Sequence, residues 1–428
     1  MNTRTFLRLN SVLALLLFVA VSAQASDKTN GKQFSWTTRS KEAKDFAAQV
    51  VRGIESFQGG PPLLTLAQKA VEADPDFAFG HYMLATFTPP PNNKQHQDKA
   101  TELAAKASDG ERRYIEAVFL VRAQQADKAL PILLDLARQY PEERMVQMML
   151  GQVYTNQGKY DEAKAAFDRA IQIDGSTPRA YAFLGNIYLL KGDYDKAREL
   201  YNKSLAKKVE GTAPFLPYNG LAYTYVYQGD VNTALKYLNT FLTEYEKTGQ
   251  TANFPPVFIW NAIGRLLLES GRPEESIKAY EKGYETVKAS TVSALDDTQR
   301  KIWLGRLHHG RGRALAKMGK HEEAWKEAEL IKKMIEEGGE QGKQFWPAYH
   351  YMAGYLKLEA GDYAKAIEHL KQADQANDPF QQLLLARAYE KAGDQENAQK
   401  VYKQVTASTQ FSIERALAYP EARKKLKS

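Results

Sequence analysis

The stretch GQVYTNQGKYDEA, residues 151–163, has a counterpart in GNIYLLKGDYDKA, residues 185–197. Each begins with Gly and has Tyr at its fourth position, Gly at its eighth, Tyr at its tenth and Ala at its thirteenth. Apolar residues on either side follow three- and four-residue spacing, which is typical of amphipathic helices. Every shared residue of the second stretch follows its counterpart by the same distance, that from Gly151 to Gly185, which is the length of a helix-pair repeat. The pattern therefore indicates a packing unit that is stacked along the chain, and not a chemical site that is used twice.

Turn glycines continue the pattern towards the C-terminus. They stand at positions 158, 192, 229, 271, 319, 361 and 393, in uneven steps of which the longest runs from 271 to 319. We expect each to take the left-handed conformation that ends the first helix of a pair. Small residues such as Gly151 and Ala163 should let paired helices approach closely, with Phe167 filling the space beside them. The longer steps predict extended helices or loops in 206–215, 246–256, 286–304 and 336–347.

The pattern resembles the tetratricopeptide repeat family, through Leu150-Gly151-x-x-Tyr154 followed by Ala163-x-x-x-Phe167. The resemblance implies an all-α fold, a right-handed α-solenoid of stacked antiparallel helix pairs. We expect divergent helix pairs in 40–141, an array of about seven repeats in 142–408, and a capping helix in 409–428, because a solenoid must cover its last apolar face. Residues 26–39 are predicted to be a disordered linker.

The beginning of the chain predicts export. Residues 1–25 combine Arg4 and Arg8 with an apolar run over 11–21 and end in Ala23-Gln24-Ala25, which is typical of a cleaved signal peptide. The run is shorter than the ~20 residues of a membrane helix. We expect cleavage after Ala25, no stable membrane span afterwards, and a periplasmic or secreted protein. The alternative is an uncleaved N-terminal anchor.

The layout also resembles exported bacterial members of this repeat family. The shared segments are TTRSKEA at 37–43, DPDF at 74–77 and GER at 110–112. No particular activity follows from this resemblance.

Composition narrows the possible functions. The chain has 428 residues and no Cys, which excludes disulfides, thiol catalysis, thiolate metal sites and a cysteine-linked lipid. Its net charge of +7 falls to +5 without Arg4 and Arg8 and is spread along the chain, so a nucleic-acid surface is not predicted.

Local motifs predict no catalytic, cofactor or metal site. The sequence around Gly158-Lys159 fails the phosphate-loop spacing, and Tyr160 stands where Ser or Thr is needed. His321-Glu322 begins like a zinc-protease helix, but Trp325 replaces the second His. We therefore predict a protein that is not an enzyme and has no cofactor.

The resemblance implies a binding surface on the first helix of each repeat. In this family, the position after the motif Gly and the position four residues earlier face a concave groove. The candidate groove residues are Gln152, Asn186, Asn219, Tyr223, Asn261, Arg265, His309, Arg313, Tyr351, Tyr355 and Arg387. None is acidic, and Arg can form paired hydrogen bonds with a carboxylate.

An extended peptide or an acidic segment of a protein partner is the ligand that this composition favours. The alternative is a solvated inner face with no ligand. The family's chaperone-binding carboxylate clamp is not expected, because Met148 and Gln152 stand where that clamp needs Lys and Asn.

The predicted function is a non-enzymatic exported scaffold of the bacterial envelope that binds a protein or peptide partner. The alternative is a carbohydrate- or nutrient-binding solenoid associated with outer-membrane uptake. The missing Cys argues against that alternative, because such proteins are normally lipoproteins. The sequence sets no oligomeric state.

Overall fold

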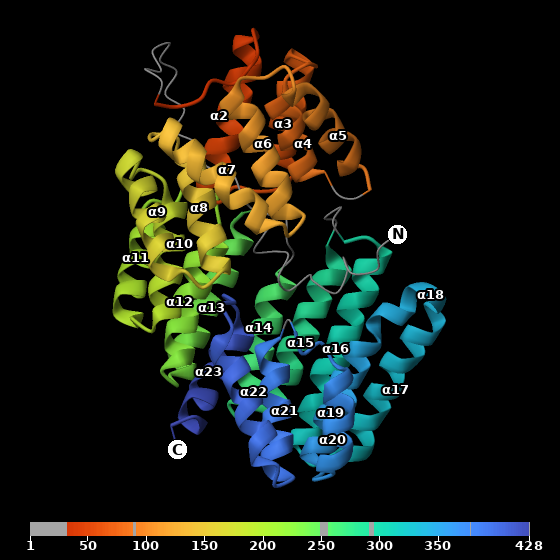
Figure 1. Cartoon of the computed structure of the whole chain (residues 1–428). Helices are drawn as coiled ribbons and strands as arrows, with labels where there is room; N and C mark the ends of the chain where they lie inside the picture. The colour runs from red at the N-terminus through yellow and green to blue at the C-terminus, as the bar shows by residue number, and fades with distance from the viewer. Residues whose placement is uncertain (1–31, 89–90, 249–255, 291–294, 377, 428) are drawn as a thin grey trace. The chain divides into compact units, whose positions relative to one another are not determined.

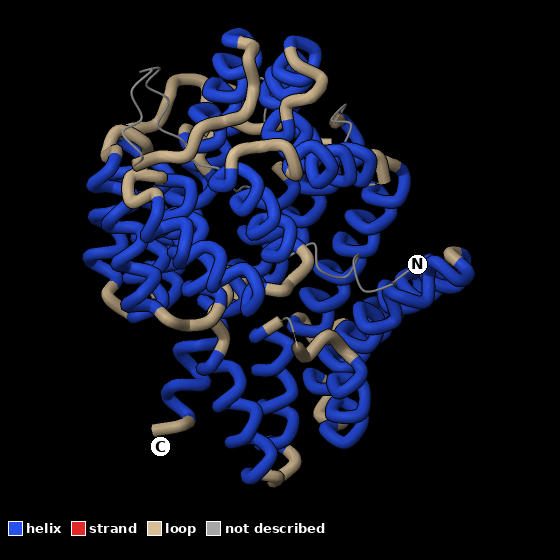
Figure 2. The backbone as a smooth tube through the Cα atoms, turned by 45° about the horizontal axis from the view of Figure 1, so that its top comes forward, coloured by secondary structure: helices blue, strands red, loops and turns tan. Residues whose placement is uncertain are grey.

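The computed structural model describes residues 32–88, 91–248, 256–290, 295–376 and 378–427. Within these ranges the regular structure is helical and contains no strand, as Figure 2 shows. The chain divides into two compact units. The described part of the N-terminal unit comprises 32–220 and 244–248, and that of the C-terminal unit comprises 221–243 and 256–427.

The helices follow one another along the whole described chain (Figure 1). The N-terminal unit holds α2 (Lys41–Glu55), α3 (Pro61–Ala73), α4 (Ala78–Phe87), α5 (Asn93–Ala104), α6 (Asp109–Arg122), α7 (Ala126–Gln139), α8 (Arg144–Asn156), α9 (Tyr160–Ile173), α10 (Pro178–Lys191) and α11 (Tyr194–Ala206). The division between the units falls within α12 (Phe215–Tyr227) and α13 (Val231–Glu246). The C-terminal unit continues with α14 (Val257–Glu269), α15 (Pro273–Ala289), α16 (Asp297–Lys317), α17 (His321–Glu337), α18 (Gly339–Gly342), η2 (Lys343–Phe345), α19 (Trp346–Glu359), α20 (Tyr363–Gln372), α21 (Pro379–Lys391), α22 (Gln395–Ala407) and α23 (Ile413–Lys425).

Within each unit, consecutive helices pack as pairs, and each pair packs against the next. The glycines of the repeat pattern allow the close approach. A Cβ on Gly151 would lie 2.5 Å from the ring of Phe167, and one on Gly185 would lie 2.7 Å from the ring of Tyr201. Only a residue without a side chain lets these buried rings lie against the neighbouring backbone. The predicted fold class, an all-α stack of helix pairs, is confirmed.

The turn glycines also take the predicted conformation. All seven have positive φ, from 72° at Gly158 to 85° at Gly192 and Gly393. The second helix of several pairs begins at an Asp cap, such as Asp193, whose side chain accepts a hydrogen bond from Lys196 N. Gly158-Lys159 is thus part of a helix-ending turn, which explains why it resembles a phosphate loop only superficially.

Longer helices account for the two long steps of the repeat on either side of Gly319. Between Gly271 and Gly319 lie α15, with 17 residues, and α16, with 21. After Gly319 the 17-residue α17 is followed by the short α18 and η2. Part of this predicted variation, at 249–255 and 291–294, lies outside the described residues.

The predicted disordered linker is wrong for its last eight residues. Residues 32–39 run along the N-terminal unit with Phe34 buried against Gly110 and Tyr140. The backbone N–H of Thr37 donates to Glu111 Oε2 at 2.5 Å, and the Ser108 hydroxyl donates to Ser35 O at 2.6 Å. The buried Phe34 ring and the paired backbone groups stabilise one conformation of the segment, whereas a disordered linker buries too little apolar surface to do so. Residues 1–31, which contain the predicted signal peptide, lie outside the described residues.

This segment also brings together three stretches that lie far apart in the sequence. The Glu111 carboxylate accepts from Thr37 N and, at 3.1 Å, from Phe79 N. The hydroxyl of Thr38 hydrogen-bonds to Asp74. Thr37 and Thr38, the turn at Asp74 and the Gly-Glu-Arg segment at 110–112 are therefore connected by hydrogen bonds.

Two glycines of α16 provide a matched test of the packing. Gly310→Ala would place a Cβ 2.4 Å from the Tyr280 ring, whereas the nearest atom at Gly305 is Met334 Cε at 4.0 Å. We expect Gly310→Ala to lower the free energy of unfolding by about 1–3 kcal/mol through overpacking. Gly305→Ala should raise it by about 0.5–1 kcal/mol, because alanine favours a helix interior. Urea unfolding of both variants checks this, and equal effects would contradict the close contact.

Candidate functional site

The eleven candidate groove residues are all buried or half-buried in this structure. In the N-terminal unit they serve packing. Asn186 Oδ1 accepts a hydrogen bond from the Tyr201 hydroxyl at 2.8 Å. Gln152 Oε1 and Asn219 Oδ1 are buried without a hydrogen-bond partner among the described residues. These three amides lie on three different helices, α8, α10 and α12.

In the C-terminal unit, by contrast, several candidates meet in one polar cluster. Arg313 donates to the hydroxyls of Tyr351 and Tyr280, both at 3.0 Å. Arg265 Nη2 lies 3.4 Å from the Tyr351 hydroxyl. The ring centroids of His309 and Tyr351 are 4.4 Å apart. The remaining candidates of this unit lie along the same series of helices, at Tyr223, Asn261, Tyr355 and Arg387.

Two arginines of this series already hold carboxylates of the chain itself. Arg265 Nη1 lies 3.0 Å from Glu414 Oε1. Arg387 donates to both oxygens of Glu421, at 2.8 and 2.5 Å, in the paired geometry that guanidinium groups form with carboxylates. Both acids belong to α23. The side chains of Arg265 and Arg387 keep 11% and 30% of their surface exposed, although Arg265 Nη1 itself is buried.

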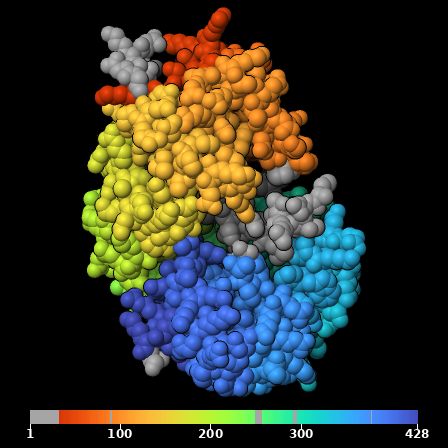
Figure 3. Space-filling view, in the orientation of Figure 1, coloured from red at the N-terminus to blue at the C-terminus, as the bar shows by residue number. Residues whose placement is uncertain are grey.

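α23 therefore does more than follow the last repeat. It packs against α21 and α22, and it also touches α14. Figure 3 shows the C-terminal blue segment lying directly on the blue helices that precede it. Arg415 is buried, donates to Ser408 O at 2.7 Å and hydrogen-bonds to the Tyr227 hydroxyl. Its guanidinium lies 4.4 Å from the ring centroid of Tyr419.

The cluster shifts the pKa values of its members. Burial lowers the pKa of His309 well below its usual value, and the nearby Arg313 lowers it further, so the imidazole is neutral. Burial raises the pKa of Glu269, whereas Arg313 and Arg387 oppose that rise. Burial lowers the pKa of Arg387, but the hydrogen bonds to Glu421 outweigh burial, and the net shift is upward. The cluster thus balances several fixed cations against Glu269, Glu414, Glu421 and the buried Asp378.

Sequence reasoning missed the acidic half of the cluster. Glu414 and Glu421 lie in the segment that the sequence predicts to be a capping helix, and Tyr280 is not among the candidate groove residues. One signal was present: the inner positions lack acids, while the tail carries two Glu seven residues apart. Since opposite charges attract, two Glu on one face of a predicted helix could have been matched with the arginines of the inner positions.

The N-terminal unit has buried cations of its own, Arg144 and Arg179, which have a structural role. Arg144 forms an ion pair with Glu55, and both side chains are 0% exposed. Arg179 Nη1 donates to Ile54 O at 2.9 Å, at the C-terminal end of α2, where a helix favours a cation. These contacts fix α2 against α8 and α10.

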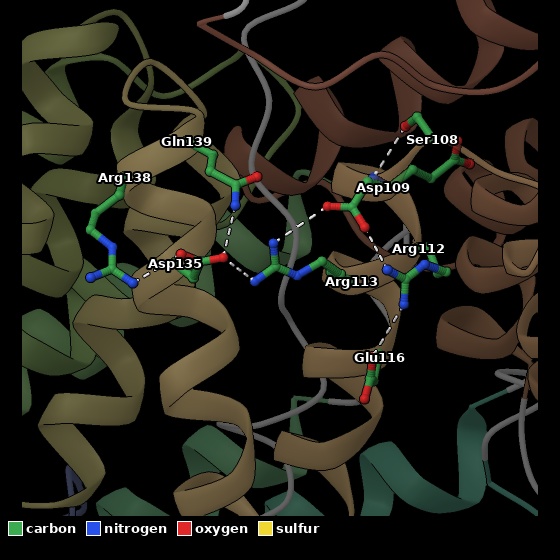
Figure 4. A network of polar contacts seen from close by, with 9 residues as sticks. Ser108, Asp109, Arg112, Arg113, Glu116, Asp135, Arg138 and Gln139 are labelled. Carbon is green, nitrogen blue, oxygen red and sulfur yellow. Dashed lines mark hydrogen bonds and ion pairs between the residues drawn. The ribbon is translucent and has the colours of Figure 1, made fainter.

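On the surface of the same unit, charges form an exposed network between α6 and α7 (Figure 4). Arg113 lies 3.4 Å from Asp109 and 2.5 Å from Asp135, and Arg138 lies 2.9 Å from Asp135. The hydrogen bonds from Arg113 and Arg138 lower the pKa of Asp135. Because the charges on each helix are already neutralised by neighbours, this network stabilises the helix pair locally and offers no free site.

The described residues contain no group of three or more His, Asp or Glu placed to hold a metal ion. His308, one of the two adjacent histidines, lies with Nδ1 2.6 Å from Glu327 Oε2, while His309 belongs to the polar cluster. No described helix is both long enough and apolar enough to cross a membrane.

Three family models, each described as a tetratricopeptide repeat, match residues 142–208, 219–290 and 357–418. No curated protein matches the chain.

Solved structures with a similar fold include the APC/C hetero-tetramer Cut9–Hcn1, at 14% identity and a TM-score of 0.45, over 87% of this chain and 57% of that one. This chain thus spans little more than half of that protein's length. PilW, a type IV pilus biogenesis factor, has 14% identity and a TM-score of 0.41, over 55% of this chain and 96% of its own. A tetratricopeptide repeat protein from Parabacteroides merdae has 15% identity and a TM-score of 0.41, over 65% and 98%. These similarities concern the fold.

Proposed function

Because the chain belongs to the tetratricopeptide repeat family, we propose that it is a non-enzymatic adaptor that binds a segment of a protein partner on the inner face of its C-terminal repeats. The observation that carries the proposal is the pair Arg265 and Arg387. Each binds a carboxylate and each stays partly exposed. Arginines in this setting select acidic segments, because the planar guanidinium matches a carboxylate with two parallel hydrogen bonds.

Arg313 has a different part in this face. It is 2% exposed and its two outer nitrogens are committed to Tyr280 and Tyr351. We propose that it sets the position of the tyrosines and contributes a long-range positive potential, while Arg265 and Arg387 make the direct contacts. A charge reversal at Arg313 would therefore test folding more than binding.

A charge swap tests the proposal without removing the ion pair that already exists. Arg387→Glu combined with Glu421→Lys keeps opposite charges at the two positions but presents an acid to the partner. Lys391→Glu, on the exposed end of the same helix, is the matched control. Partner proteins captured from an envelope extract should be retained by the unchanged chain and the control, and weakened about tenfold or more by the swap.

Equal capture by all three proteins would refute the proposed site. Retention of a glycan without any protein would instead favour the carbohydrate-binding alternative. Thermal unfolding of the swap variant, expected within a few degrees of the unchanged chain, separates a binding defect from a folding defect.

The proposed place of action is the bacterial envelope. Support comes from the signal-like residues 1–25 and from the absence of Cys in a chain of 428 residues. Mass spectrometry of the protein from a cell fractionation tests this. A mature N-terminus at Ser26 in the periplasmic or secreted fraction is the expected result, and a membrane-bound chain that retains residues 1–25 would favour the anchor alternative.

A further inference from the structure

We propose that α23 is an internal ligand of this face, and that the partner presents a helix with two carboxylates seven residues apart. This inference rests on the proposed function, and it replaces the extended peptide expected from sequence with a helical one. In the free chain α23 occupies these arginines, and the partner helix would compete with α23 for them.

The geometry of α23 supports a helical ligand. Residues seven apart on an α-helix point within about 20° of one another and are separated by roughly 10.5 Å along the axis. Glu414 and Glu421 have this spacing, and each meets an arginine from a different helix, Arg265 of α14 and Arg387 of α21. One face of a single helix therefore contacts two repeats at once. In an extended peptide, two acids seven residues apart would lie too far from each other to contact the same two arginines.

Beside the two acids, α23 presents a narrow apolar stripe. Ala418 and Ala422 are fully buried and lie on the same face as the carboxylates. Their small side chains let the helix lie close to the repeats. The stripe continues to Lys425, which pairs with Glu390 of α21. The pattern that the face recognises is thus acid, small residue, acid and small residue, then a base.

A terminal cap alone does not require all these contacts. Covering the last repeat needs contact with α21 and α22, which α23 provides. The helix and its approach segment also reach earlier elements: Phe411 lies 5.1 Å from Tyr223, and Tyr419 lies 5.9 Å from Tyr227, ring centroid to ring centroid. Contacts with α12 and α14 show that the segment lies across the inner positions of several repeats.

The composition of α23 makes it replaceable. Three of its four buried apolar side chains are alanines, beside Ile413. Such a helix buries little apolar area, so polar contacts provide much of its attachment. A partner helix with the same acids and larger apolar side chains would bind in its place. Ser408 to Ser412 join α23 to α22 without regular helix, so release of α23 breaks no helix of the last repeat.

The test weakens α23 in the full chain and then offers its sequence in solution. Glu414→Gln with Glu421→Gln removes both charges and keeps the shape, and Glu274→Gln with Glu396→Gln, at two exposed positions of the same unit, is the control. Amide hydrogen exchange in residues 413–425 should accelerate at least about tenfold in the first variant and stay unchanged in the control. Unchanged exchange in both would overturn the inference.

A labelled synthetic peptide of residues 409–428 provides the second measurement. It should bind the Glu414→Gln, Glu421→Gln chain at least about tenfold more tightly than the unchanged chain, whose face is occupied. The same peptide with both Glu replaced by Gln, or with the second acid moved to position 418, should bind the variant at least about tenfold more weakly.

The outcomes separate this inference from the proposed function. If the peptide binds but no protein is captured, α23 is still an internal ligand of this face, and the proposed adaptor function is refuted. A captured protein without peptide binding would refute only the internal ligand. A further outcome is that the unchanged chain dimerises as its concentration rises, while the Gln variant does not. That result would show that α23 is exchanged between two copies, and it would overturn the proposed competition within one chain.

Discussion

Replacing Arg144 with methionine is expected to lower the free energy of unfolding of the N-terminal unit by about 3–5 kcal/mol, which is typical of removing one partner from a buried ion pair. Both Arg144 and Glu55 have fully buried side chains, so the variant leaves an acid in the interior without its cation. Arg144 Nη1 also lies 3.2 Å from Asp174, and that contact is lost as well. Hydrogen exchange in α2 and α8 measures the local effect without assuming that the two units unfold together.

Two further variants show whether the unpaired charge is the cause. Arg144→Met combined with Glu55→Leu removes both charges and should recover most of the loss, because apolar pairs often replace buried ion pairs at little cost. Arg138→Met, at a 77% exposed side chain of the same unit, should change stability by less than about 0.5 kcal/mol. A loss below about 1 kcal/mol for Arg144→Met would show that the pair contributes little.

The fold could be predicted from sequence because the repeat is local. Gly151, Tyr154 and Ala163 determine how one helix lies on the next, and the same requirement recurs at the matching positions of 185–197. The positive φ of every turn glycine follows from the chain reversal that each pair needs. Nothing beyond neighbouring helices enters these predictions, so a pattern in the sequence is sufficient.

Contacts between distant segments could not be predicted in this way. Glu55 and Arg144 lie on different helix pairs, and no periodic pattern relates them. The packed segment at 32–39 is mostly polar, and it takes a fixed path through contacts such as those of Phe34 and Thr37 with α6 and of Trp36 with Phe79. Whether such a segment is ordered depends on a surface that lies several helices away along the chain.

The candidate site falls between these two cases. The repeat register placed Arg265, Arg313 and Tyr351 on one series of helices, and the structure brings them together. The register could not show that α23 supplies acids to two of the arginines. That contact depends on how the last helices turn back across α14, which follows from the summed geometry of several repeats. Binding by these residues stays a prediction.

Arg313→Met is expected to lower the free energy of unfolding of the C-terminal unit by about 3–5 kcal/mol, since two buried hydroxyls lose a charged hydrogen-bond donor, at about 1.5–3 kcal/mol for each bond. The hydroxyls of Tyr280 and Tyr351 lose their donor, and Glu269 loses the nearby cation that most opposes the upward shift of its pKa. Lysine is not expected to rescue the variant, because a single ammonium group cannot hold both hydroxyls in the planar arrangement of a guanidinium.

The pH dependence of this loss follows from two neighbours. The folded-state pKa of Glu269 is raised, so its contribution is full below the unfolded pKa and is lost as pH rises through the folded pKa. Removing Arg313 raises that pKa further and enlarges the loss at high pH. The folded-state pKa of His309 is lowered, so its contribution is lost as pH falls, and removing Arg313 eases that loss. Both effects make the deficit of Arg313→Met smaller near pH 5 than near pH 8.

Urea unfolding of the variant and the unchanged chain at the two pH values measures this difference. Lys301→Met, at an exposed position of the same helix, serves as the control and should show a small deficit that does not depend on pH. A deficit for Arg313→Met that is the same at both pH values would mean that its charge is not coupled to Glu269 and His309. The stability that Arg313 provides would then come from packing and from its hydrogen bonds to Tyr280 and Tyr351.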